Sequence, residues 1–167
     1  MTRSFKGWIA MGLFSAIAGL VGCDRVATGE LQIGQSTVAD MKTKMGEPAS
    51  VVKEGDKEVW EYPLGPEGVK TYRMTVNAQG VLEKIDQILT DENFRRIVPG
   101  MTITEVRAVI GKPARDKRYA MSYNEATYQW KFNKNNADLF FEVLIDGNGR
   151  VKSTGVADPS LERGSSK

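Results

Sequence analysis

The chain contains no histidine and only one cysteine, Cys23. Zinc sites built from cysteine and histidine are therefore excluded, and so are catalytic triads that use a histidine base. A single cysteine also cannot form a disulfide within the chain. An enzyme that works with carboxylates alone stays open, but the Asp and Glu residues are scattered and no pair stands out.

The N-terminal segment has the features of an export signal. Arg3 and Lys6 are followed by the uncharged residues 7–22, which end in small residues directly before Cys23. A basic start, an apolar stretch and a small-residue exit are typical of a signal peptide. This stretch is short for a membrane-spanning helix, which needs roughly 20 apolar residues. An uncleaved signal anchor with an incidental cysteine is the alternative interpretation.

Leu20-Val21-Gly22-Cys23 resembles the lipobox of a bacterial lipoprotein, in which the cysteine after the cleavage site is acylated. On this interpretation residues 1–22 are a signal peptide and residues 23–30 a short membrane tether. Two or three acyl chains hold a protein stably on a membrane, because each buried methylene contributes about 0.8 kcal/mol. Acylation also removes the only thiol from the list of possible nucleophiles.

The charges of the chain balance once the signal segment is set aside. Lys and Arg number 23 and Asp and Glu number 21, and Arg3 and Lys6 account for the difference. A nucleic-acid-binding protein needs a basic surplus or a basic patch, and the sequence shows neither. Nucleic acid is therefore not an expected partner.

Two segments, 34–48 and 100–113, carry the same succession of residue types. Each has a threonine with an acid three residues later, which is the signature of a helix capping box. Each then has a glycine with a proline close behind, which is typical of a helix end. The corresponding residues are Thr37 and Thr102, Asp40 and Glu105, and Gly46 and Gly111. This repeat predicts two short helices with the same caps.

Strand-like stretches follow each predicted helix. Aromatic residues occupy alternate positions, with Trp60 and Tyr62 corresponding roughly to Trp130 and Phe132. The expected strands are 58–62, 71–76, 127–132 and 139–145, with turns at 77–80 and 146–149 and a further strand after each turn. Residues 146–149 faintly resemble a calcium loop but lack the ligands and the terminal glutamate of an EF-hand, so we interpret them as a hairpin turn.

The predicted fold class is α+β, with two tandem units of one or two short helices packed on an antiparallel β-meander. The first unit spans 31–89 and the second 90–157. The second has an extra helix at 91–97, for which Thr90 is the N-cap. The tail, 158–167, is predicted to be disordered because it is rich in polar residues.

Residues 94–113 resemble the BamE (SmpA/OmlA) family of outer-membrane lipoproteins. The likeness rests on Pro99-Gly100-Met101-Thr102, Glu105-Val106 and Gly111-Lys112-Pro113, and the strand around Trp130 and the hairpin 146–151 extend it to about residues 90–154. The family fold is two helices on a three-stranded antiparallel sheet, and its best-known members are accessory subunits of the machine that inserts β-barrels into the outer membrane. The doubled unit resembles the tandem arrangement of the β-lactamase inhibitor protein, which presents a concave sheet to its partner.

The resemblance implies a non-catalytic scaffold or accessory protein that is held on the periplasmic face of the outer membrane by acylated Cys23. Barrel-assembly subunits are the implied protein partners, and no cofactor or metal is expected. Asp24 leaves the inner membrane as a possible location, because an aspartate after the lipidated cysteine resembles the inner-membrane retention signal of enteric bacteria. The alternative is an independent protein-binding module, such as an enzyme inhibitor or a ligand sensor, that uses the double sheet.

We expect the aromatic face of each sheet to pack under the helices and the opposite face to be open to a protein partner. The candidate partner-binding residues on that open face are Arg73, Thr75, Gln129 and Lys131. An ordinary solvated sheet face is the alternative for these residues, and exposed sheet edges could instead recruit a client strand.

Overall fold

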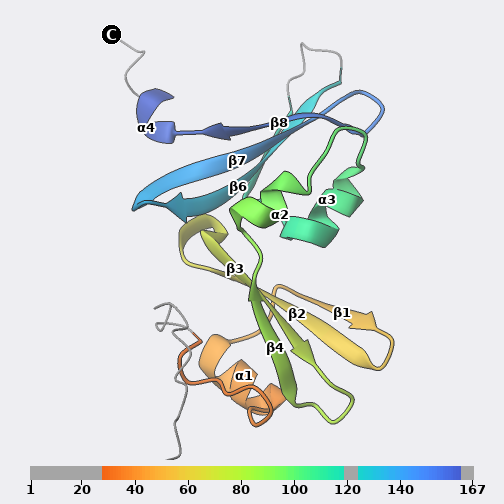
Figure 1. The fold of residues 1–167 in the computed structure, drawn as a ribbon, viewed down its shortest axis with the longest axis vertical. Coiled ribbons are helices and arrows are strands. Elements are labelled where there is room, and N and C mark those ends of the chain that lie inside the picture. The colour runs from red at the N-terminus through yellow and green to blue at the C-terminus, as the bar shows by residue number, and fades with distance from the viewer. Residues whose placement is uncertain (1–27, 119–123, 163–167) are drawn as a thin grey trace, which may run out of the picture.

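The computed structural model describes residues 28–118 and 124–162 (Figure 1). The signal segment, Cys23 and Asp24 lie outside the described residues. The first half of the chain forms α1 (Val38–Met45), β1 (Ser50–Glu54), β2 (Lys57–Leu64), a short 3-10 turn η1 (Pro66–Gly68), β3 (Lys70–Val76) and β4 (Leu82–Gln87). The second half forms α2 (Asp91–Arg95), α3 (Ile103–Ile110), β5 (Arg115–Arg118), β6 (Ala126–Lys134), β7 (Ala137–Ile145), β8 (Val151–Ala157) and α4 (Pro159–Glu162).

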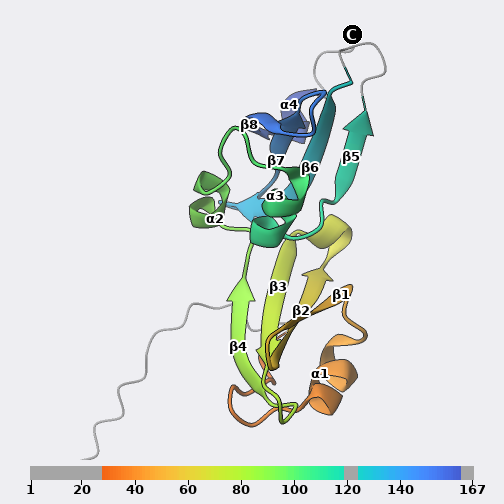
Figure 2. The same ribbon diagram turned by 90° about the vertical axis from the view of Figure 1, so that its right-hand side faces the viewer.

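The strands form two separate antiparallel meanders, β1-β2-β3-β4 and β5-β6-β7-β8. We call the half with β1–β4 the first unit and the half with β5–β8 the second unit. In Figure 1, α2 and α3 lie between the two sheets, and Figure 2 shows α1 at the end of the molecule away from the second unit. The α+β class with antiparallel meanders is confirmed.

Each sheet has one strand more than the sequence predicts, because β1 and β5 precede the expected strands. All five residues of β1 are exposed, so β1 lacks the alternation of apolar and polar residues that marks a half-buried strand. β5 reads Arg-Asp-Lys-Arg and has no apolar residue at all. Both strands form because each continues directly from a helix end into pairing with an aromatic-rich strand, β2 or β6.

Each unit has its own hydrophobic core on the aromatic face of its sheet. In the first unit, Met41 of α1 is fully buried against Trp60, Tyr62 and Met74. The second core brings Val106 and Ile110 of α3 and Phe94 of α2 onto β6 and β7. Phe94 stacks on Phe141 with a centroid distance of 4.3 Å and meets Phe132 edge-on at 4.9 Å. The prediction that the aromatic faces pack under the helices is confirmed.

The predicted caps of α1 and α3 are confirmed in both helices. The hydroxyl oxygen of Thr37 accepts the Asp40 N–H, and the Asp40 carboxylate accepts the Thr37 N–H at 2.8 Å. Thr102 and Glu105 make the same two contacts, the second at 2.7 Å. The backbone groups that have no partner within a helix are thereby satisfied at each start.

The strand correspondence predicted from the sequence is shifted by two residues. The Ala49 N–H bonds to the Glu61 carbonyl, and the Ala114 N–H bonds to the Gln129 carbonyl. These equivalent bonds align Glu61 with Gln129, and therefore Tyr62 with Trp130. Counted from the glycines that end the helices, the hydrogen bonds give three extra residues before this strand in the second unit, whereas alignment by the aromatic residues alone implies five.

The two ends of the second sheet give one confirmation and one correction. The turn after β7 is a hairpin, in which Asp146 Oδ1 accepts the N–H groups of Asn148 and Arg150 at 2.9 and 3.0 Å. The prediction of a disordered tail is wrong for residues 159–162, which form α4. Pro159 opens this helix, and the carboxylate of Asp158 accepts both the N–H and the O–H of Ser160.

None of the helices in the two described ranges has the length and apolar character needed to cross a bilayer.

The capping boxes predict a specific dependence of stability on pH. The hydrogen bond from the Thr102 backbone lowers the pKa of the Glu105 carboxyl, and the Thr102 hydroxyl adds to the effect. A carboxyl group whose pKa is lower in the folded state stabilises the fold at pH values above its unfolded-state pKa, which is about 4.3 for Glu. This stabilisation is lost as the pH falls through the folded-state pKa. Glu105→Gln keeps an acceptor but removes the charge. Thermal unfolding should therefore show the wild type as more stable than Glu105→Gln at pH 7, with the difference shrinking as the pH falls below about 4.3. A difference that stays constant with pH would contradict this assignment.

Candidate functional site

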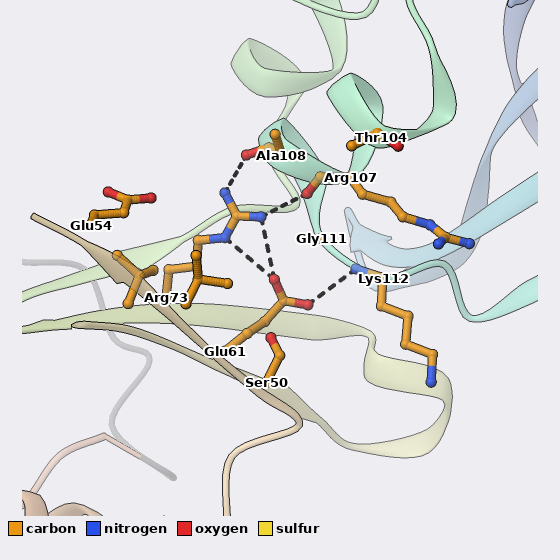
Figure 3. A pocket seen from close by; sticks show the side chains of 11 residues that line it. Ser50, Glu54, Glu61, Arg73, Thr104, Arg107, Ala108, Gly111 and Lys112 are labelled. Carbon is orange, nitrogen blue, oxygen red and sulfur yellow. Dashed lines mark hydrogen bonds and ion pairs between the residues drawn. The ribbon is translucent and has the colours of Figure 1, made fainter.

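The C-terminal end of α3 packs on the outer face of the first sheet, and an arginine makes the contact. Arg73 of β3 donates one hydrogen bond to the Arg107 carbonyl at 2.8 Å and another to the Ala108 carbonyl (Figure 3). The Arg107 carbonyl also accepts the N–H of Gly111 at the helix end, at 2.9 Å. Carbonyls in the last turn of a helix carry a partial negative charge and can accept further donors. Arg73 thus satisfies the end of a helix that belongs to the other unit.

Glu61 of β2 lies directly across from Arg73 in the sheet register. Its Oε2 accepts Nε and Nη2 of Arg73, both at 3.3 Å, and its Oε1 accepts the Lys112 backbone N–H at 3.1 Å. Only 10% of the Glu61 side chain and 21% of the Arg73 side chain are exposed. Removal of either partner from such a pair leaves an uncompensated, largely buried charge.

Gly111 lies against Glu61, at a contact between the two units. Its φ of 76° is one that side-chain-bearing residues rarely adopt, and a Cβ atom here would lie 2.8 Å from Glu61 Oε1. The Gly111 carbonyl accepts the indole N–H of Trp130 at 3.0 Å, deep in the second core. The absence of a side chain at Gly111 therefore allows Glu61 to reach Lys112.

A second set of charges joins the units at η1. Glu67 bonds to Arg115 of β5 and lies 3.5 Å from Lys131 of β6. Lys131 also pairs with Asp138 at 3.2 Å, and the hydrogen bond from Asn133, together with Lys131, lowers the pKa of that carboxyl. The contacts that join the two units thus include Glu61–Arg73 with α3 and Glu67 with the second sheet.

A groove of about 530 Å³ runs between the outer face of the first sheet and α3 (Figure 3). Ser50, Val52 and Val59 form the sheet wall, and Thr104, Arg107 and Ala108 form the helix wall. The Glu61–Arg73 pair and Gly111 lie at its base, with Glu54 at one end and Lys112 at the other. Both units contribute to this groove, so it exists only while they are held together.

The four residues predicted to share an open sheet face do not do so. Arg73 lines the groove, but its guanidinium is engaged by Glu61 and α3. Lys131 is held by Glu67 and Asp138, and Gln129 is only 3% exposed and donates to Glu142. Thr75 is half-buried and does not line the groove.

The prediction of an open face is therefore wrong for Arg73, Gln129 and Lys131. That prediction assumed that no residue of the other unit contacts the outer face of either sheet. In fact α3 covers part of the first sheet, and η1 contacts the second sheet. Sequence reasoning missed Glu61, Gly111 and Lys112 as site residues. The only local signal was an acid, Glu61, between two aromatic residues of one strand.

Among the described residues, no three Asp, Glu, Cys or His side chains gather where they could hold one metal ion. The groove instead offers exposed apolar side chains between an acidic and a basic end. Such an arrangement is suited to binding a polypeptide, because apolar contacts supply affinity and charged ends supply orientation.

Comparisons with known proteins give limited matches. Neither a protein-family model nor a curated protein sequence matches the chain. Among solved structures, one assigned as the osmotically inducible lipoprotein OsmE is 24% identical, with a TM-score of 0.37, and the match covers 46% of this chain and 90% of that one. YjgB of Bacillus subtilis, a DUF4309 family protein, is 14% identical with a TM-score of 0.31, and the match covers 77% of this chain and 82% of that one. Neither likeness is strong enough to carry a conclusion about function.

Alanine substitutions at the two glycines that end the helices distinguish the stability lost through backbone strain from the stability lost when the contact between the units is disturbed. Gly46→Ala and Gly111→Ala place a Cβ at nearly the same φ, 78° and 76°, and the backbone strain should cost each variant about 1–3 kcal/mol. Only Gly111→Ala also displaces Glu61, since a Cβ at Gly46 would meet nothing within 4 Å. Urea unfolding should show Gly111→Ala as the less stable variant by about a further 1 kcal/mol. Equal losses would mean that the Glu61 contact contributes nothing.

Loss of the arginine should be costly. Arg73→Met removes the arginine from the Glu61 carboxylate and from the end of α3. We expect the free energy of unfolding to fall by about 2 kcal/mol. This is less than the roughly 3–5 kcal/mol lost when a fully buried pair is broken, because Arg73 is partly exposed. Glu61→Gln combined with Arg73→Met should lose less than the sum of the single variants. Lys84→Met, which breaks the exposed Lys84–Asp86 pair, is the control and should change stability by less than about 0.5 kcal/mol. Additive losses in the double variant would show that the two side chains are not coupled.

Proposed function

We propose that this chain is a lipid-anchored protein of the bacterial envelope that acts by binding other proteins and not by catalysis. The observation that carries the proposal is the groove between the units, in which exposed Val52 and the neighbouring Val59 lie between the acidic Glu54 and the basic Lys112. The lipobox at Cys23 supplies the anchor, and the groove supplies the binding surface.

Within this proposal the chain is built of two tandem units, each with one or two helices packed on a meander. The matched capping boxes of α1 and α3 support this division, as do the equivalent hydrogen bonds Ala49–Glu61 and Ala114–Gln129. The arrangement would resemble that of the β-lactamase inhibitor protein in having two units side by side. The binding surface is then the junction between the units and not the open face of a sheet.

The anchor would hold the first unit close to the membrane. Leu31 is buried in the first core, so the chain is fixed to the folded unit from this residue onward. An extended chain spans at most about 3.6 Å per residue, so the eight steps from Cys23 to Leu31 reach roughly 29 Å. A partner bound at the groove would therefore be membrane-associated itself or recruited to the membrane surface.

The favoured role is that of an accessory protein in outer-membrane β-barrel assembly or envelope integrity, on the periplasmic face of the outer membrane, with the inner membrane as the other possible site because of Asp24. The likeness of residues 90–154 to the BamE family is the basis of this role. An independent binding module, such as an enzyme inhibitor or a ligand sensor, is the second candidate, and it is favoured by a groove that needs both units.

The anchor is tested by fractionation of cells that express the full chain. The wild type should be found with the membranes, and mass spectrometry should find an acylated Cys23 at the mature N-terminus. Cys23→Ala should be released into the soluble periplasm, because the anchor is lost. An unacylated membrane protein that retains Met1 would contradict the lipoprotein assignment.

The role is tested by crosslinking in intact cells, followed by purification from the membranes. Recovery of barrel-assembly subunits would support the accessory role. Recovery of a soluble enzyme or a small molecule instead would favour the second candidate.

A further inference from the structure

Within residues 28–118 and 124–162, no strand pairs with the outer edge of β1. β1 is the terminal strand of the first sheet and pairs only with β2. All five of its residues are exposed, including Val51 at 47% and Val52 at 54%. Alternate residues of an antiparallel strand direct their N–H and C=O groups away from the partner strand, so part of the β1 backbone faces the open edge. Such an edge is a template for another strand.

The edge strands β4 and β8 are each covered by a loop at their first residue, and β5 is charged. The loop before α1 bonds to the start of β4, where Leu82 N–H donates to the Ser36 carbonyl. The loop before α3 bonds in the same way to β8, where Val151 N–H donates to the Met101 carbonyl. β5 carries a charged residue at every position, which discourages strand addition. Nothing comparable protects β1 in the part of the chain that the structure describes, apart from Lys53.

The open edge and the groove lie side by side. Ser50, Val52 and Glu54 alternate along β1 and all three line the groove, while Val51 and Lys53 do not. Side chains of a strand added beside β1 would alternate in the same way and would place every second residue in the groove. The added strand would gain main-chain hydrogen bonds from β1 and side-chain contacts from the groove.

The charges at the two ends of the groove define the sequence that fits. Glu54 lies near the β1–β2 turn and makes no ion pair with any of the described residues. At the other end of the groove, the Lys112 side chain has no acidic partner among the described residues. The Arg107 guanidinium, which also has no acidic partner there, lies 5.8 Å from the centre of the Tyr128 ring. The Glu61–Arg73 pair between them is internally neutral.

We propose that the groove binds an extended segment of a protein partner that adds to β1 as an antiparallel fifth strand. This segment places a basic, an apolar and an acidic side chain, in that order and at alternate positions, beside Glu54, Val52 and Ser50, so that the acidic side chain lies at the Lys112 end of the groove. The order follows from direction, since β1 runs from the Lys112 end toward Glu54 and an antiparallel strand meets Glu54 first. The inference rests on the proposed protein-binding function and names the chemistry of the partner.

The first test compares two synthetic peptides on the full chain purified in detergent. One peptide carries Lys-Thr-Val-Thr-Glu between Gly-Ser flanks, and the other carries the same residues as Glu-Thr-Val-Thr-Lys. Fluorescence polarisation should show at least tenfold tighter binding of the first. The double variant Glu54→Lys with Lys112→Glu should reverse the preference. Equal binding of the two peptides, or a preference that the double variant leaves unchanged, would overturn the proposed orientation.

The second test uses adjacent valines as a matched pair. Val52→Asp places a charge in the groove and should weaken binding of the first peptide at least tenfold. Val51→Asp makes the same change at a similarly exposed position outside the groove and should change binding less than threefold. Both positions are exposed, and unchanged unfolding midpoints will show that the variants fold. Equal effects of the two substitutions would exclude the groove as the binding site.

The third test examines strand addition itself. N-methylation of a peptide amide that faces β1 removes a main-chain hydrogen bond and should weaken binding at least tenfold, while methylation of the next amide, which faces solvent, should change it little. Insensitivity to both would exclude an added strand. Failure of all peptides to bind would overturn this inference but would leave the fractionation and crosslinking results intact, so the two proposals fail separately.

Discussion

The arrangement of the molecule depends on one ion pair of the first unit that also binds the second unit. Glu61 and Arg73 are neighbours in the first sheet, yet their remaining hydrogen-bonding capacity is used by the end of α3 and by Lys112. Each unit has its own hydrophobic core, so cores alone do not fix how the units meet. The pair supplies a directional contact in which a cation satisfies the carbonyls of a helix end. The walls of the groove stay at a fixed spacing because this contact connects them.

The same helix-ending glycine has different surroundings in the two units. Gly46 and Gly111 follow α1 and α3 with almost the same backbone angles. Space is open around Gly46, whereas Gly111 lies against Glu61 and, through its carbonyl, against Trp130. Gly46 thus only ends a helix in the first unit, whereas Gly111 both ends a helix and lies at the contact between the units. This difference explains why only Gly111 takes part in the junction.

Local signals in the sequence predicted α1, α2 and α3, their N-caps, the turn at 146–149 and the aromatic faces, because each depends on residues within a few positions of one another. β1 was not predicted because its residues are all exposed and show no alternation. The junction was not predicted either, since Arg73 and Arg107 are 34 positions apart and Glu61 and Lys112 are 51 apart. A polar residue opposite an aromatic face indicates the outer side of a sheet, but it does not reveal that a helix from another unit packs there.

The buried pair also determines which charges are free to select a ligand. An unpaired arginine at the base of the groove would attract any anion, but Glu61 neutralises Arg73 and both side chains are mostly buried. The charges left for a ligand are those at the ends, Glu54 and Lys112, separated by an apolar stretch. Two opposite charges at a fixed separation discriminate between the two directions of a bound strand, because the reversed strand would face like charges at both ends. The pair that holds the units together thus also keeps the middle of the groove neutral, and this neutrality allows the ends to determine orientation.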